Sequence, residues 1–230
     1  MAENSKGSMK FIVILTVVVI GLVAAFVVLD SKNNSGSESN TASSGDSPSL
    51  EGQPTIGESD APVEIVEFGD YLCPACKVWS DQVFPLLKQD YIDSGDANLT
   101  YINVLFHGED SVLASSAGEA VYKQAPEKFW DFNKQLYATQ PEEHQEGWLT
   151  EEKIVEAAEK SVPSIDIEQM KQDMESEEIQ QEVQKDDTLV KEHGVQVTPT
   201  VMINGEMVED PFNYEEISNK IEQAIEDSNE

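Results

Sequence analysis

The stretch that decides the fold is Val63-Glu64-Ile65-Val66-Glu67-Phe68-Gly69-Asp70-Tyr71-Leu72-Cys73-Pro74-Ala75-Cys76. Its first six residues, 63–68, are rich in valine and isoleucine and predict a β-strand. Behind the second cysteine, apolar residues recur at helical spacing, which predicts a helix. The stretch is therefore expected to form a strand, a short turn and a helix that carries two thiols in its first turn.

The two thiols are the only ones in a chain of 230 residues. The first turn of a helix presents unpaired backbone N–H groups and the positive end of the helix dipole. Both favour the thiolate, which is the reactive form in disulfide exchange. We therefore predict that Cys73 is the attacking thiol and that Cys76 is its resolving partner.

Two other uses of the cysteine pair stay open. A structural zinc ion would need further ligands from His107, His144 and His193, which show no paired spacing. A structural disulfide between Cys73 and Cys76 would close a very short loop and restrain little of the unfolded chain. We expect redox chemistry instead.

The charge of the chain excludes one class of partner. It has 45 acidic residues against 14 basic ones, all of them lysine, and a net charge of −31. Such a chain repels phosphates, so we expect no nucleic acid partner. From Gln53 onward there are 40 acids and 11 lysines, a net charge of −29 spread along the sequence. This pattern predicts a solvated acidic surface whose self-repulsion salt would screen, as in a halophilic protein.

The N-terminal segment predicts a membrane anchor. Residues 11–29 (Phe11 to Leu29) contain no charge and are long enough to cross a bilayer as a helix. Lys6 and Lys10 precede them and favour a cytoplasmic segment 1–10, with the rest of the chain exported. A cleaved signal peptide is the alternative, but the run is longer than usual for one and no clear cleavage site follows it. We expect an uncleaved signal-anchor.

The chain beyond the anchor divides into a linker and one domain. Residues 30–52 are rich in serine, asparagine and glycine and predict a flexible tether. Residues 53–230 are expected to form the extracytoplasmic domain. Because the surroundings outside the cytosol are oxidising, a Cys-x-x-Cys pair kept there without any other cysteine indicates disulfide exchange.

The remaining elements follow in a recognisable order. A second strand is predicted over 99–106, and residues at about 109–193 show helical spacing with no convincing strand. Strands over 200–203 and 206–208 flank Asn204-Gly205, which is a strong hairpin signal. A final helix carries isoleucines at helical spacing.

This order resembles a thioredoxin fold, an α/β architecture, with an inserted helical domain between the second and third core strands. The close resemblance is to DsbA-like thiol–disulfide oxidoreductases, particularly the membrane-anchored BdbD type of Gram-positive bacteria, and it covers about residues 57–225. The segments that carry it are 66–76, Phe129-Trp130 and Val197-Thr198-Pro199-Thr200.

The resemblance implies roles for three further residues. Pro199 matches the cis-proline that faces the cysteines, where the Thr198 backbone would pair with a substrate chain as a strand. Glu67 matches a buried acid beneath the disulfide that relays a proton to or from Cys76. An ordinary trans proline and an exposed strand glutamate are the alternatives. Ala75 stands where the best-known strong oxidants have histidine, which leaves the oxidising strength open.

The function that the resemblance implies is an extracytoplasmic protein dithiol oxidase, which introduces disulfides into unfolded exported proteins. It would need no cofactor beyond its redox-active disulfide, and a quinone-linked membrane oxidoreductase of the DsbB or BdbC kind would reoxidise it. Some relatives carry a structural calcium ion, for which the sequence assigns no ligand. A disulfide reductase or isomerase, and a non-enzymatic redox-fold binding module, are the alternatives.

Overall fold

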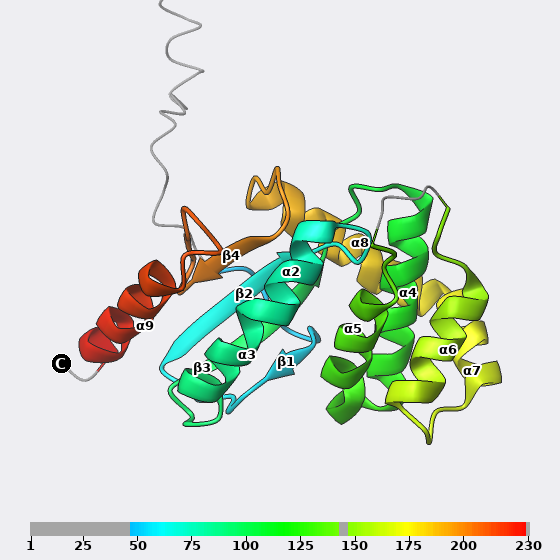
Figure 1. The fold of residues 1–230 in the computed structure, drawn as a ribbon, viewed down its shortest axis with the longest axis horizontal. Helices are drawn as coiled ribbons and strands as arrows, with labels where there is room; N and C mark the ends of the chain where they lie inside the picture. Colours follow the sequence, from blue (N-terminus) through cyan, green and yellow to red (C-terminus); the bar gives the residue numbers. More distant parts are fainter. Residues whose placement is uncertain (1–46, 143–146, 229–230) are drawn as a thin grey trace, which may run out of the picture. The chain divides into compact units, whose positions relative to one another are not determined.

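The computed structural model describes residues 47–142 and 147–228, and these fold around a five-stranded mixed sheet (Figure 1). The predicted segment 1–10, the predicted anchor 11–29 and the predicted linker as far as residue 46 lie outside the described residues. Among the described residues, no helix is both long and apolar enough to cross a bilayer.

The strand order in the sheet is β1-β3-β2-β4-β5. The central strand β2 runs parallel to β3 and antiparallel to β4, while β1 and β5 add antiparallel edges. The strands are β1 (Thr55–Ile56), β2 (Val63–Gly69), β3 (Ala97–Asn103), β4 (Thr200–Ile203) and β5 (Glu206–Met207).

Helices follow β2, fill the interval between β3 and β4, and close the chain. The fold is thus the predicted thioredoxin fold with helices inserted between the second and third core strands. The helices are α2 (Pro74–Gln82), α3 (Phe84–Leu87), the π-helical turn η1 (Lys88–Ile92), α4 (Glu109–Gln124), the 3-10 turn η2 (Pro126–Lys128), α5 (Phe129–Ala138), α6 (Glu151–Ser161), α7 (Ile167–Met174), α8 (Glu177–Glu192) and α9 (Tyr214–Ser228).

Both faces of the sheet are buried beneath helices. Alternate residues of β2 point to opposite faces, so the strand contributes to both cores. Val63 and Ile65 pack with α2, α3 and α9, whereas Val66 and Phe68 pack with α8. Figure 1 shows α2 and α3 lying across one face of the sheet, and α4, α5, α6 and α7 grouped beside it. Leu50 packs against the cluster on the α8 face, so the packed part of the described chain begins before the predicted boundary at Gln53.

One predicted strand is too long at its end. The strand predicted over 99–106 is observed as β3, which ends at Asn103. Beyond it, the Val104 N–H donates to the Gly69 carbonyl and the Phe106 N–H donates to the Asp70 carboxylate. The apolar residues 104–106 thus turn over the end of β2 instead of continuing the ladder.

The hairpin between β4 and β5 forms where Asn204-Gly205 predicted it. Asn204 has φ 46° and Gly205 has φ 80°, the positive angles that a tight two-residue turn needs. The hairpin fixes β4 against β2, and with it the Thr198-Pro199 segment that precedes β4.

Candidate active site

The two thiols lie at the start of α2, one near the surface and one beneath it. Cys73 is the N-cap residue, and Pro74 occupies the first turn, where its missing N–H leaves no hydrogen bond unmade. Cys73 is 8% exposed, whereas Cys76 is fully buried at 0%. Both cysteines are free, so the structure shows the dithiol form of the predicted redox pair.

The surroundings separate the pKa values of the two thiols. The Cys73 pKa falls to about 5, chiefly because the Cys76 thiol hydrogen-bonds to it, against an opposing effect of burial. Hydrogen bonds from the Thr198 side chain and from the N–H groups of Cys76 and Ala75 lower it further. Burial, the hydrogen bond to Cys73 and nearby negative charge all raise the pKa of Cys76. The pair therefore combines an ionised outer thiol with an inner thiol that keeps its proton.

Thr198 and Pro199 face this pair from the opposite side of the site. The Cys73 Sγ lies 3.4 Å from the Thr198 carbonyl oxygen, to which the protonated thiol donates. The Thr198–Pro199 peptide bond is cis, as the resemblance implies. Because β4 begins at Thr200, next to this bond, the strand carries the Thr198 backbone to the outer thiol.

Glu67 lies on the central strand β2, between Tyr101 of β3 and Val201 of β4. It is 2% exposed, which excludes the exposed strand glutamate considered as the alternative. Its Oε1 has no hydrogen-bond partner in the described residues. Burial, followed by negative charge at Cys73, raises the Glu67 pKa well above its usual value. The acid is therefore neutral at a pH where an exposed glutamate would be charged.

Aromatic side chains from β3 and the inserted helices form the wall beside Cys76. The Tyr101 and Tyr137 hydroxyls lie 2.8 Å apart in the core, and the Tyr71 ring packs against both tyrosine rings. A Cβ at Gly69 would come within 2.6 Å of the Tyr101 ring, so only glycine fits there. The sequence analysis assigned these tyrosines no role, since the contacts join residues far apart in the chain.

Two polar side chains tie the turn before α2 to the inserted helices, and the sequence analysis missed both. The Gln140 side-chain amide donates to the carbonyls of Tyr71 at 2.8 Å and Cys73 at 3.1 Å. The Asp70 carboxylate accepts from the Phe106 N–H, between β3 and α4, and from the Ser111 hydroxyl in the first turn of α4. The sequence held a signal for Asp70 alone, which is a polar residue between the predicted strand and the cysteines. It held none for Gln140.

The histidines considered as zinc ligands lie in different surroundings. His107 Nδ1 lies 2.8 Å from the Asp70 carboxylate, the His193 ring packs against Phe68, and His144 lies outside the described residues. Over residues 47–142 and 147–228, no three His, Cys, Asp or Glu side chains gather in a metal-binding arrangement.

A second buried polar cluster lies where α4 and α8 meet β3. Asn103 Nδ2 donates to Glu119 at 2.8 Å and to Asp186 at 2.7 Å, and Gln53 donates to Asp186 at 2.6 Å. Burial raises the pKa of Glu119 to about 8 and that of Asp186 to about 7, with repulsion from Asp186 adding to the Glu119 shift. The Asn103 Oδ1 is buried without a partner in the described chain. As possible metal ligands, the cluster thus offers oxygen atoms but no thiol or imidazole.

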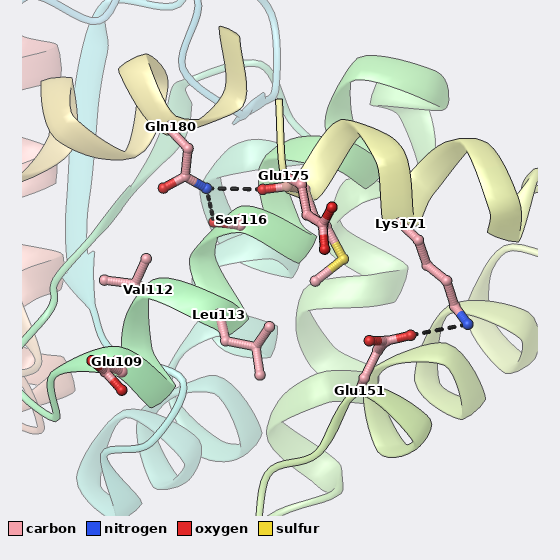
Figure 2. A pocket seen from close by; sticks show the side chains of 9 residues that line it. Glu109, Val112, Leu113, Ser116, Glu151, Lys171, Glu175 and Gln180 are labelled. Carbon is pink, nitrogen blue, oxygen red and sulfur yellow. Dashed lines mark hydrogen bonds and ion pairs between the residues drawn. The ribbon is translucent and has the colours of Figure 1, made fainter. Parts of the chain in front are cut away.

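A cavity of about 230 Å³ between the inserted helices contains neither thiol. Figure 2 shows two polar pairs in its lining, Lys171 with Glu151 and Gln180 with Ser116. Because this cavity holds no thiol, the cysteines at the start of α2 are the better candidate site.

A thioredoxin family model matches residues 49–223. Disulfide bond formation protein D of Bacillus subtilis is 42% identical over 193 residues, which are 84% of this chain and 86% of the relative. A probable disulfide bond formation protein D of Bacillus anthracis is 38% identical over 200 residues, 87% of this chain and 88% of the relative.

Solved structures show the same likeness. The crystal structure of oxidised BdbD from Bacillus subtilis superposes with a TM-score of 0.76 at 40% identity, over 81% of this chain and 100% of that one. The crystal structure of Chlamydia trachomatis DsbA gives a TM-score of 0.68 at 27% identity, over 76% of this chain and 93% of that one.

Proposed function

Because the chain belongs to the thioredoxin family and is a DsbA-like thiol–disulfide oxidoreductase, we propose that it oxidises the dithiols of exported proteins through Cys73 and Cys76. The observation that carries the oxidising direction is the position of Cys73 at the N-cap of α2, where hydrogen bonds from Cys76, Thr198 and helix N–H groups lower its pKa to about 5. A thiolate that is stabilised at neutral pH stabilises the reduced protein, and so makes the disulfide a stronger oxidant.

The first step is attack by a client thiolate on Cys73 Sγ of the oxidised pair. A disulfide forms between the client sulfur and Cys73 as the Cys73–Cys76 bond breaks, and the bonding electron pair leaves on Cys76 Sγ. The Thr198 carbonyl next to Cys73 is a hydrogen-bond acceptor for the client backbone. The cis bond to Pro199 keeps this carbonyl beside the sulfur. Cys76 then takes up a proton, for which the buried and protonated Glu67 is the proposed donor.

The second step releases the product. The second client thiolate attacks the client sulfur of the mixed disulfide, and the electron pair leaves on Cys73. The client is oxidised by two electrons and the protein returns to the dithiol form. The low Cys73 pKa favours this step because a more acidic thiol is a better leaving group.

The reduction potential of the full-length protein tests the direction. Potentials in this superfamily run from about −270 mV for thioredoxin to about −120 mV for the strongest oxidant. We expect a value nearer the oxidising end but short of its limit, since Ala75 replaces a histidine. A potential close to that of thioredoxin, together with no oxidation of reduced ribonuclease, would assign the protein to the reductases.

Anchoring belongs to the same proposal. With residues 11–29 in the cell membrane and residues 53–230 on its outer side, clients would be proteins that emerge unfolded with free thiols. A quinone-linked membrane oxidoreductase of the DsbB or BdbC kind would then accept the electrons in the same plane. Fractionation of cells before and after an alkaline wash tests the anchor, because a spanning helix resists that wash.

The calcium ion that the resemblance implies for some relatives fits the second polar cluster. Glu119 and Asp186 offer carboxylate oxygens, and the Asn103 and Gln53 side-chain amides, whose N–H groups face these acids here, would add neutral oxygens by turning over, the hard ligands that Ca²⁺ prefers. A bound ion would offset the cost of burying two acids and would tie α4 and α8 to β3. Melting should shift upward in calcium chloride, and the shift should vanish in Asp186→Asn.

The acidic surface supports a high-salt habitat as a further part of the proposal. The net charge of −31 gives a self-repulsion that dissolved salt would relieve.

A further inference from the structure

Asp70 connects β2 to the turn before α2, and its carboxylate is fully buried. Its Oδ1 accepts from the Leu72 N–H at 2.9 Å, and its Oδ2 accepts from the Phe106 N–H at 3.0 Å. The Ser111 hydroxyl lies 3.0 and 2.9 Å from the two oxygens, and His107 Nδ1 lies 2.8 Å from Oδ2. The carboxylate thus binds its own turn to the segment that begins α4.

The backbone of the same residue reaches the inner thiol. The Asp70 N–H donates to Cys76 Sγ at an N···S distance of 3.5 Å. This hydrogen bond favours the charged form of Cys76, in opposition to burial and to the nearby negative charge. One residue therefore holds the active-site turn by its side chain and the resolving sulfur by its main chain.

We propose that Asp70 is a positioning residue for Cys76: its buried carboxylate fixes the turn so that its own N–H stabilises the charge that appears on Cys76 Sγ. The charge appears when a thiolate attacks Cys73, the Cys73–Cys76 bond breaks and the bonding electron pair leaves on Cys76. The attacking sulfur is oxidised and Cys76 is reduced, and a proton then neutralises Cys76. The inference deepens the proposed function, from which it takes this step.

The physical reason lies in the burial of Cys76. A charged sulfur with no exposure loses its water, and the cost is large unless hydrogen bonds replace the water. Hydrogen bonds to a charged acceptor are about twice as strong as those between neutral groups. The Asp70 N–H is therefore worth more in the transition state, where Cys76 carries charge, than in the dithiol, where Cys76 is neutral.

This difference predicts a specific signature. A loosened turn slows the breaking and the making of the Cys73–Cys76 bond by the same factor. It leaves the equilibrium between disulfide and dithiol almost unchanged, because Cys76 is uncharged in both forms. A residue that only supports the fold would lower the melting temperature without this selective loss of rate.

The test measures the rate at which dithiothreitol reduces the oxidised full-length protein. Samples are quenched at intervals, and the reduced fraction is measured by mass spectrometry. Asp70→Asn keeps the size of the side chain but turns an NH2 group toward donors. Ser111→Ala keeps the charge and removes one hydroxyl. Asp173→Asn and Ser116→Ala are the matched controls, since Asp173 is a buried acid paired with Lys123, and Ser116 is a buried α4 serine bonded to Gln180.

We expect a rate about tenfold lower in Asp70→Asn and about threefold lower in Ser111→Ala, as for one weakened hydrogen bond to a charged group. Both controls should react at the unchanged rate even where they melt earlier. The reduction potential should move by less than about 5 mV in either variant, whereas a tenfold change in the equilibrium constant would move it by about 30 mV and a threefold change by about 14 mV. If Asp70→Asn does not fold, the rate of reduction of Ser111→Ala, compared with that of its control Ser116→Ala, tests the inference.

Rates in both variants equal to those of the controls would overturn the inference. So would a potential that shifts by the full factor lost in rate. Dithiothreitol reduces the disulfide whichever way the protein works, so this result is independent of the proposed oxidase direction. Failure of the proposed function would appear instead in the potential of the unchanged protein.

Discussion

Two regions of the site have opposite effects on negative charge. The entrance consists of Cys73, Thr198 and Pro199, and the floor consists of Cys76 and Glu67. At the entrance, hydrogen bonds lower the Cys73 pKa to about 5. At the floor, burial raises the pKa of both Cys76 and Glu67. The two thiols lie three residues apart, yet their pKa values differ because Cys73 accepts hydrogen bonds from the Cys76 thiol, Thr198 and helix N–H groups, whereas Cys76 is buried beside Glu67. The comparison teaches that a negative charge is stabilised at the mouth of the site, while protons are retained beneath it.

Removing each thiol in turn should break the comparison most severely. Cys76→Ala leaves Cys73 able to form a mixed disulfide with a client but removes the thiol that would resolve it. We expect mixed disulfides with exported proteins in Cys76→Ala and none in Cys73→Ala, as seen on non-reducing gels that collapse on addition of reductant. Equal amounts of adduct in the two variants would contradict the assigned roles.

The pH dependence of the reduction potential should show the Cys73 pKa directly, as a change of slope. Below about pH 5 the disulfide takes up two protons with two electrons, whereas above it Cys73 stays ionised and one proton is taken up. The potential should therefore fall by about 60 mV per pH unit below pH 5 and by about 30 mV above it. Equilibration with glutathione between pH 4 and pH 8 measures both slopes.

A single slope of about 60 mV from pH 4 to pH 8 would show that the entrance does not lower the Cys73 pKa. Alkylation of the reduced protein with iodoacetamide is the companion measurement. Its rate should rise to half of its maximum near pH 5, far below the ordinary cysteine value of about 8.5.

Glu67→Gln should separate proton transfer from stability at the floor. Loss of a buried proton donor is expected to slow reduction of the disulfide by about a hundredfold, the lower end of general acid catalysis. The same substitution should raise the stability of the folded protein at neutral pH. A folded-state pKa above the unfolded one gives stability that is present below about pH 4.5 and is lost as pH rises.

Glu67→Gln should therefore unfold at higher temperature than the unchanged protein at pH 7, and the gain should shrink toward pH 4.5. Glu64→Gln on the same strand is the control, because Glu64 is partly exposed. A gain that is independent of pH, or an unchanged rate, would mean that Glu67 holds no proton for Cys76.

The smallest expected effect comes from charges outside both regions. Screening contracts from a Debye length of about 10 Å at 0.1 M salt to about 3 Å at 1 M. With a net charge of −31, the protein should melt a few degrees higher in 1 M than in 0.1 M sodium chloride. A flat or falling melting temperature in calorimetry would remove the halophilic interpretation, while the pKa difference between entrance and floor would stand.

The sequence by itself determined the elements and their order. The strand at 63–68, the Cys-x-x-Cys helix, the Asn204-Gly205 hairpin and the helical interval follow from local patterns, because period and turn chemistry act between neighbours. The thioredoxin fold and the thiol–disulfide chemistry were predicted from the family that these elements and the cysteine pair resemble, and both are confirmed.

Only the tertiary structure decided which side chains meet beneath the thiols. Nothing local placed Gln140 on the carbonyl of Cys73, or Ser111 on the Asp70 carboxylate, since these partners are 67 and 41 residues apart. The end of β3 at Asn103 likewise depends on a distant segment, because its partner Gly69 is the last residue of β2 and the Phe106 N–H then donates to Asp70 instead. A buried polar group takes whatever partner the fold brings within hydrogen-bond distance, and that distance depends on packing rather than on sequence pattern.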